Sequence, residues 1–368
     1  MPLRIEMKKQ NVLMGVVVVL LATGFTYMNR VQQPKPVKKV VAVNTQLDAS
    51  LKSIKTSIDQ AKYTEAYTSL RKALLSYPGN AELLKLKRQL VLADYKASVT
   101  NNAELSLVLD RKTNPAKCDA GLVNVESDKV FIQRVNYIRR LAGVYDSCVL
   151  DPALNKKAQH AAYMMDVNNQ LSHAPKTSWK CYTKEGAATA GSSNLSLGYG
   201  FIDALMGQIE DFGPNNGVVG HRRWILNPDN NVFGHGSTNN AMCLYVIGTY
   251  NKVLSKTISI PDTQFVAWPS ADYFPKALVP QRWSFSLKGA EFEQAIVTVN
   301  AGTKSVKTIK EKPEYGYAMN TLVWQVHETF SANVKYTVRI SNVKIYNSAI
   351  SKYQYKTFTY SVTPVSEE

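Results

Sequence analysis

The hydrophobic positions of the chain change their spacing along its length, and each change marks a different kind of segment. No charged residue stands between Lys9 and Arg30, and the apolar stretch at 11–28 is long enough to cross a bilayer as one helix. A cleaved signal peptide is the alternative, but no clean Ala-x-Ala site follows the apolar run. We therefore expect an uncleaved membrane anchor in 1–43, which ends in an extended linker at 31–43.

Helical spacing of apolar residues follows from about Thr45 to Tyr95. The small residues Ala66 and Ala73 stand where two helices of a hairpin would touch, and Pro78 comes after the second helix, so the stretch resembles a tetratricopeptide repeat. Only one copy is visible, whereas about three are normally needed to bury a continuous face. We expect 44–97 to be a helical spacer or a docking element.

Periodicity is lost between 98 and 125, which we interpret as a linker. In the following region, 126–249, apolar residues return every three or four positions and predict two longer helices, which begin near Ser127 and Asp151. The other elements predicted there are a short helix near 201–212 and strands at 232–236 and 241–248.

In the last part of the chain, 250–368, short β-branched and aromatic runs alternate with a period of two and are separated by Gly, Asn and Pro. Clear examples are 296–299, 336–340 and 355–360. We expect an antiparallel β-sandwich of about seven strands, Ig-like in class.

The formal net charge of +16 matters less than its distribution. Residues 113–249 hold 12 basic and 11 acidic side chains, so the positive excess lies in the flanking segments. A nucleic-acid-binding protein concentrates Lys and Arg where its recognition residues lie, so we expect no nucleic acid. The expected partners are the membrane, through the N-terminal helix, and an anionic envelope polymer, a lipid or a protein.

Four cysteines without a CxxC pair argue against a zinc ribbon or a thioredoxin-like motif and indicate disulfides. An oxidising compartment places the bulk of the chain outside the cytoplasm, as a single-pass membrane protein of the cell envelope, or secreted if the signal is cleaved. The sequence does not choose among the three pairings. Our interpretation joins Cys118 to Cys148 and Cys181 to Cys243.

Two histidines stand beside turn-forming residues, His173 within 171–175 and His221 within 220–228, and look like two halves of one polar cleft. Together with Asp151-Pro152-Ala153-Leu154 and Asn194-Leu195, these motifs follow the order of the CAP superfamily (cysteine-rich secretory proteins, antigen 5 and pathogenesis-related 1 proteins) in its bacterial form. The resemblance covers 126–249. It implies a three-layer α-β-α CAP sandwich over this region. With the transmembrane helix and helical hairpin expected before it and the antiparallel β-sandwich expected after it, the whole chain is expected to be α+β.

The resemblance also implies a central cleft with two histidines and two acidic residues, in which the histidines bind a divalent metal in some members. His173 and His221 match the histidines. At the acidic positions stand Ser193, directly before Asn194, and Gln208. Neutral Ser and Gln are poor zinc ligands, so we expect a ligand-binding polar cleft without a cofactor, with zinc on the two histidines as the alternative.

An envelope hydrolase, a peptidase or esterase, is a second hypothesis, because Ser193 near two histidines offers a nucleophile and a base. No nucleophile elbow surrounds Ser193, whose neighbourhood resembles a turn, and no carboxylate is assigned to orient either imidazole. We therefore expect a non-catalytic binding or envelope-associated module. An adaptor that acts through the helical hairpin is a third hypothesis. The predicted cleft residues are His173, Ser193, Asn194, Gln208, His221 and Arg222.

Three polar residues in this region also have structural interpretations. Arg222 is expected to pair or stack locally more than to bind a ligand. His160 lies among alanines on a helix and is expected to be a packed core residue, and His235 lies between two glycines, as expected of a loop residue at a strand end.

Overall fold

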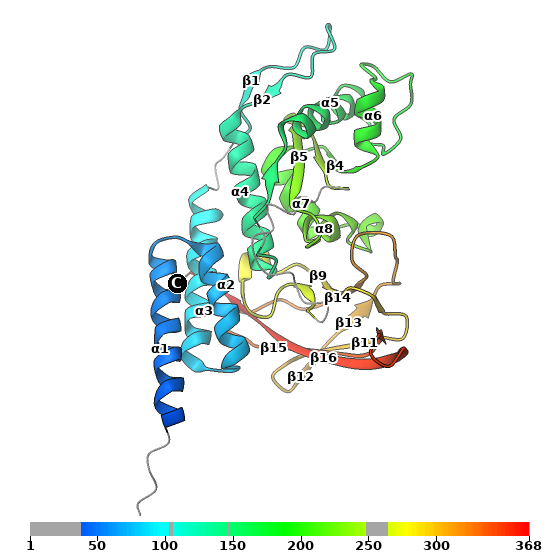
Figure 1. The fold of residues 1–368 in the computed structure, drawn as a ribbon. Helices are drawn as coiled ribbons and strands as arrows, with labels where there is room; N and C mark the ends of the chain where they lie inside the picture. The colour runs from blue at the N-terminus through cyan, green and yellow to red at the C-terminus, as the bar shows by residue number, and fades with distance from the viewer. Residues whose placement is uncertain (1–37, 103–105, 146, 248–263, 368) are drawn as a thin grey trace, which may run out of the picture. The chain divides into compact units, whose positions relative to one another are not determined.

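The computed structural model describes residues 38–102, 106–145, 147–247 and 264–367 (Figure 1). The chain divides into two compact units, Met1–Asn44 and Thr45–Glu368. The predicted membrane helix at 11–28 lies outside the described residues. Within the part of the chain that is described, no helix is long and apolar enough to cross a membrane.

Three helices open the described part of the chain, as the helical spacing predicts. Ala66 and Ala73 are buried, and the side chain of Asn80 caps the third helix by accepting a hydrogen bond from a backbone N–H. The resemblance to a tetratricopeptide repeat stays a prediction. The helices are α1 (Lys38–Asp59), α2 (Tyr63–Ser76) and α3 (Ala81–Ser98).

The start of α1 corrects the predicted extended linker at 31–43. The chain is helical from Lys38 onward, because its last proline before the helix is Pro36 and no glycine follows to interrupt the backbone hydrogen bonds. Composition alone overstated the length of the linker.

Helix α3 is joined to the next part of the chain by a buried ion pair. Asp94 is fully buried and accepts two hydrogen bonds from the Arg140 guanidinium, at 2.7 and 3.1 Å. Arg140 belongs to α4 (Val125–Leu141), and Arg134 of the same helix donates to the backbone carbonyl of Ser98 (2.9 Å). Because a buried charge needs a partner, this ion pair holds the helical segment against α4.

The predicted linker at 98–125 contains regular structure. Strands β1 (Leu109–Arg111) and β2 (Leu122–Val123) pair antiparallel as a short ribbon, which precedes α4 (Figure 1). Strands of two and three residues leave no periodic pattern in a sequence.

The disulfide joins Cys118, at the tip of this ribbon, to Cys181, with Cα atoms 5.2 Å apart. Both predicted pairings are therefore wrong. Cys148 and Cys243 are buried thiols that take part in no disulfide. The fold brings together two loops 63 positions apart, which sequence spacing does not reveal.

A three-layer α-β-α sandwich follows, as expected. Alternate residues of the central strand β6 face opposite layers: Ala241 and Cys243 pack against α5, whereas Met242 and Leu244 belong to the core that contains α4 and α7. The sheet order is β3-β5-β6-β4, with β3 and β5 parallel and the other pairs antiparallel. The elements are β3 (Val149–Leu150), α5 (Pro152–Asn168), α6 (Lys184–Ala190), β4 (Ser193–Leu197), α7 (Phe201–Glu210), α8 (Gly220–Ile225), β5 (Val232–Ser237) and β6 (Ala241–Tyr245).

The contact between α5 and β5 depends on a glycine. A Cβ built on Gly236 would lie 2.1 Å from the backbone nitrogen of Gln159, so any other residue would push the helix away from the sheet. Asp151 begins α5 by accepting from the backbone N–H groups of Ala153 and Leu154, as its place before Pro152 predicts.

The C-terminal part is a β-sandwich with a core of aromatic side chains. Phe285 of one sheet lies against Phe358 of the other, with ring centroids 5.2 Å apart. Ten strands form sheets of six and four within residues 264–367, so the predicted count of about seven is too low. The pair β16 and β8 is parallel, so the predicted antiparallel arrangement does not hold throughout. The strands are β7 (Val266–Trp268), β8 (Asp272–Pro275), β9 (Arg282–Ser286), β10 (Ala290–Glu291), β11 (Ile296–Ala301), β12 (Lys304–Val306), β13 (Thr308–Lys310), β14 (Thr321–Val326), β15 (Tyr336–Asn347) and β16 (Lys352–Val365).

Candidate functional site

The two predicted histidines line one cavity of about 630 Å³ in the sandwich, beside the edge strand β4. Ser193, Asn194 and Gln208 line it as well, so five of the six predicted cleft residues come together. We call this cavity the cleft. No Lys, Arg, Asp or Glu is among its lining residues, which makes its wall polar but formally uncharged apart from the histidines.

His221 is oriented by a buried carboxylate that the sequence analysis missed. Its Nδ1 lies 2.7 Å from Oδ1 of Asp211, which is fully buried, and Oδ2 of Asp211 accepts from the backbone N–H of Arg222 (3.2 Å). Because a carboxylate only accepts, Nδ1 carries the proton and Nε2 of a neutral His221 is left as an acceptor. The sequence did not allow a carboxylate to be assigned to either imidazole, and the structure pairs Asp211 with His221.

Asp211 reaches His221 through its backbone conformation. It ends α7 with a left-handed φ of +52°, which Asp adopts more readily than most residues. A signal was present in the sequence, since an acidic residue at a helix end ten positions before His221 can return to it across a turn.

His173 has an equivalent orientation with a different partner. Its Nδ1 lies 2.9 Å from the backbone carbonyl oxygen of Ala190, at the end of α6. A carbonyl oxygen only accepts, so Nδ1 again carries the proton and Nε2 of the neutral ring is free to accept. Both histidines thus offer an Nε2 lone pair.

Ser193 is engaged away from the imidazoles. Its hydroxyl donates to the backbone carbonyl of Thr189 (2.6 Å), and the residue is buried. The turn predicted at 191–194 is confined to Gly191 and Ser192, because β4 begins at Ser193, which pairs with Tyr245 of β6. The sheet, rather than a loop, therefore fixes the position of this hydroxyl.

Gln208 lines the cleft and has one buried polar atom without a partner in the described part of the chain. Its side chain is 3% exposed, its Nε2 donates to Oγ of Ser196 (3.0 Å), and its Oε1 has no hydrogen-bond partner among the described residues. Asn194 is satisfied, since its Nδ2 donates to the backbone carbonyl of His221 (3.1 Å). A buried acceptor without a partner costs free energy until a donor reaches it.

Arg222 does not line the cleft, contrary to its place among the predicted cleft residues. Its buried guanidinium donates to the backbone carbonyls of Ile209 (2.6 Å), Glu210 (2.7 Å) and Arg282 (2.9 Å), and burial lowers its pKa to about 10. The structural role expected for Arg222 is therefore the one observed.

The C-terminal sandwich supplies one wall of the cleft, which the sequence analysis did not foresee. Gly316 and Tyr317 line the cavity, and the guanidinium of Arg223 lies over the Tyr317 ring, 5.4 Å from its centroid. Arg223 also donates to the backbone carbonyls of Glu314 (2.9 Å) and Met319 (2.9 Å). No local pattern connects residues about a hundred positions apart.

Arg282 of β9 makes a second set of contacts between the C-terminal sandwich and the cleft region, at the segment that follows α7. Its guanidinium donates to the backbone carbonyls of Asp211, Asn216 and Gly213 and lies 3.6 Å from the Glu311 carboxylate. The turn that carries the partner of His221 is thus held by the sandwich.

The donor set of the cleft does not fit a zinc site. Zinc takes three or four protein ligands, or three and a water. Within the described ranges no group of three or more His, Cys, Asp and Glu could hold a metal ion, and the Asp211 carboxylate is already bonded to His221 and to a backbone N–H.

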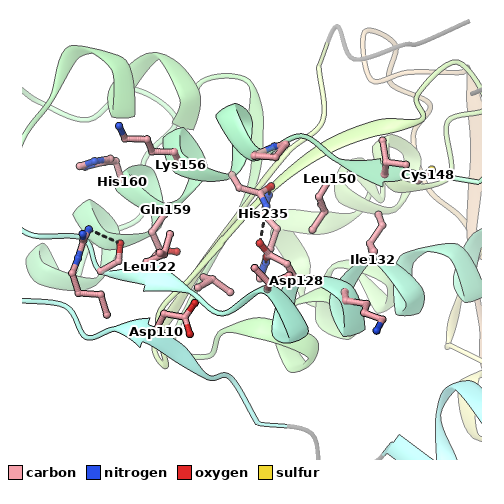
Figure 2. Close-up of a pocket in the computed structure, with 18 residues that line it drawn as sticks. Asp110, Leu122, Asp128, Ile132, Cys148, Leu150, Lys156, Gln159, His160 and His235 are labelled. Atoms are coloured by element: carbon pink, nitrogen blue, oxygen red, sulfur yellow. Dashed lines mark hydrogen bonds and ion pairs between the residues drawn. The ribbon is translucent and has the colours of Figure 1, made fainter. Parts of the chain in front are cut away.

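A second cavity, of about 690 Å³, lies between the β1–β2 ribbon, α4 and α5 (Figure 2). Two histidines line it, and neither lies in the surroundings predicted for it from the sequence. His160 is half-buried rather than a core residue, and His235 lies inside β5, fully buried, rather than in a loop. The ring of His235 lies between Asp128 (Nδ1 to Oδ1, 2.7 Å) and Ser237 (Nε2 to Oγ, 2.8 Å), and it stacks on Phe131.

Comparison with known proteins identifies the class of this region. Residues 132–250 match the model of the cysteine-rich secretory protein family, CAP, so the three-layer sandwich with the two-histidine cleft is a CAP domain. The curated proteins contain no match to the chain.

Among solved structures, the chain is similar to the N-terminal part of the bacterial S-layer protein SbsC, with 13% identity and a TM-score of 0.20. The match covers 91% of this chain and 60% of that chain. At this TM-score the likeness supports no inference about fold or function.

Proposed function

We propose that this chain is an extracytoplasmic binding protein whose CAP cleft holds a neutral, hydroxyl- or amide-rich ligand such as an envelope glycan. The observation that carries the proposal is Oε1 of Gln208, a buried acceptor without a partner among the described residues, on a residue that lines the cleft. The Nε2 atoms of His173 and His221 are further acceptors on the same wall. Three acceptors on one wall favour a ligand that donates.

The aromatic rings around the cleft support a glycan. Tyr199, Phe212 and Tyr317 line the cavity and remain more than a third exposed, so their faces are available to the apolar face of a sugar ring. An anionic polymer, one of the expected partners, would find no Lys or Arg among the lining residues. A neutral glycan is the better match to this wall.

Titration calorimetry with chito-oligosaccharides tests the proposal. Gln208→Met removes the acceptor with little change in volume and is expected to weaken binding about tenfold, whereas Gln208→Glu keeps an acceptor and is expected to retain most of the affinity. Gln170→Met, at an exposed position outside the cleft, is the matched control. Equal binding by all four proteins would refute a role for Gln208, and no binding by the wild type would refute the glycan.

A hydrolase is the second candidate, and the Asp211–His221 pair favours it. An imidazole whose Nδ1–H is held by a carboxylate has the orientation of a general base, with Nε2 available to take a proton from water. Incubation with glycan, ester and peptide panels, followed by mass spectrometry, tests this role. Turnover that His221→Gln abolishes would establish it, and intact substrates after incubation with pure protein would end it.

The disulfide supports the extracytoplasmic location, since such bonds persist in oxidising compartments. Anchoring by the N-terminal apolar stretch is part of the proposal. Fractionation of cells that produce the full chain tests it: extraction from membranes by detergent but not by carbonate is expected, and release into the soluble fraction would contradict an anchor.

A further inference from the structure

The second cavity shares no lining residue with the cleft, and its volume of about 690 Å³ lies in the range of small-molecule sites. Its walls come from five segments: the β1–β2 ribbon, α4, β3, α5 and β5. The ribbon is tied to the α5–α6 loop by the Cys118–Cys181 disulfide. The β1–β2 ribbon, which forms one wall of the cavity, is therefore covalently attached to the CAP region.

One end of this cavity is apolar. Ile132 of α4 and Leu150 of β3 lie there with Cys148, as Figure 2 shows. Val125 and Val149 are further apolar residues that line the cavity. Such a surface gains free energy by burying the hydrocarbon part of a ligand.

The other end carries positive charge that the protein leaves unpaired. Lys156 and His160 are one turn apart on α5 and lie together at this end in Figure 2. Neither side chain has a hydrogen-bond or ion-pair partner among the residues that the structure describes. An anionic group at this end would meet both.

The remaining charged groups of the wall already have partners. Asp128 accepts from His235 and from Asn155 (2.7 Å), and Asp110 accepts from Asn124 (2.6 Å). The two other cations are paired as well, Arg111 with Asp119 (3.0 Å) and Lys129 with Glu126 (3.3 Å). Lys156 is thus the lining lysine or arginine that has no ion-pair partner among the described residues.

We propose that this cavity binds a single-chain amphiphile with an anionic head group. The head group lies at Lys156 and His160, and the hydrocarbon chain lies against Ile132 and Leu150. The site is separate from the glycan cleft, so the proposal does not depend on the function assigned to that cleft.

The test compares three probes of equal chain length, namely dodecanoate, dodecanol and dodecyltrimethylammonium, in titrations below their micelle concentrations. Dodecanoate is expected to bind most tightly. Lys156→Ala is expected to weaken dodecanoate about threefold to tenfold and to leave dodecanol unchanged, because it removes one partly exposed charge pair. The matched control is Lys157→Ala on the same helix, whose ammonium group pairs with Glu185 (3.3 Å).

Ile132→Ser tests the apolar end and is expected to weaken dodecanoate and dodecanol alike. Because Ile132 is half-buried, thermal unfolding of the variant is compared with that of the wild type. Equal affinity for the three probes, or equal loss in the Lys156 and Lys157 variants, would overturn the anionic head group. Dodecanoate binding that Tyr317→Ala abolishes would place the amphiphile in the cleft, and dimerisation that Leu122→Asp prevents would make a second copy of the chain the occupant; both outcomes overturn the proposal.

Discussion

The Asp211 carboxylate lies 2.7 Å from Nδ1 of His221 and accepts from the backbone N–H of Arg222, while the Arg282 guanidinium donates to the backbone carbonyl of Asp211. His221 belongs to the CAP domain, whereas Arg282 belongs to the C-terminal sandwich. The orientation of one cleft imidazole therefore depends on both parts of the chain.

Asp211→Asn is expected to let His221 populate both neutral tautomers, with the proton on Nδ1 or on Nε2. A neutral amide can donate or accept, so it no longer requires the proton on Nδ1. Nitrogen-15 NMR of the ring checks this, with the wild type showing a protonated Nδ1 and the variant a mixture. Asp203→Asn, at an exposed position in the first turn of α7, is the control. An unchanged tautomer in Asp211→Asn would show that the pair does not fix the ring.

Arg282→Ala is expected to lower the free energy of unfolding by about 2–4 kcal/mol, because three backbone carbonyls lose a charged donor. Binding in the cleft is expected to weaken in the same variant, since the turn that carries Asp211 loses its support. Urea unfolding and calorimetry measure the two effects. Arg339→Ala, an exposed position on β15, is the control, and equal stability of both variants would contradict the coupling.

Reduction of the Cys118–Cys181 disulfide is expected to destabilise the chain by about 4 kcal/mol, because the bond closes a loop of 63 positions. Denaturant unfolding of Cys118→Ser with and without reductant checks the value. Thiol titration gives the complementary count: two thiols, Cys148 and Cys243, are expected in the unfolded oxidised protein. A count of zero would show that Cys148 and Cys243 also take part in disulfides and would contradict the single bond.

Burial raises the pKa of the Cys243 thiol to about 12, so it stays protonated in the folded protein. The unfolded thiol ionises near pH 9. The folded state thus holds the proton more tightly, and this contribution to stability is present below pH 9 and is lost as the pH rises from 9 towards 12. Unfolding across this range is expected to show a steeper loss for the wild type than for Cys243→Ala. Equal slopes would contradict a shifted thiol.

Hydrophobic period and motif order predict the helices, the CAP sandwich and the existence of a β-rich tail, because amphipathic spacing is a local property of the chain. The match to the motifs of the CAP family also predicts one shared cavity for five residues, and all five line it in the structure: His173, Ser193, Asn194, Gln208 and His221. The strand count of the tail is underestimated, because β10 and β12 are too short to show alternation.

The sequence by itself determines which side chains can serve the cleft, two imidazoles and an amide with no matching acid. Only the tertiary structure decides how these groups are used. Asp211 reaches His221 across a turn, Tyr317 arrives from a separate sandwich, and Cys118 meets Cys181 rather than Cys148. These contacts join segments far apart in the chain, and their geometry is set by packing and by backbone hydrogen bonds that leave no periodic trace in the sequence.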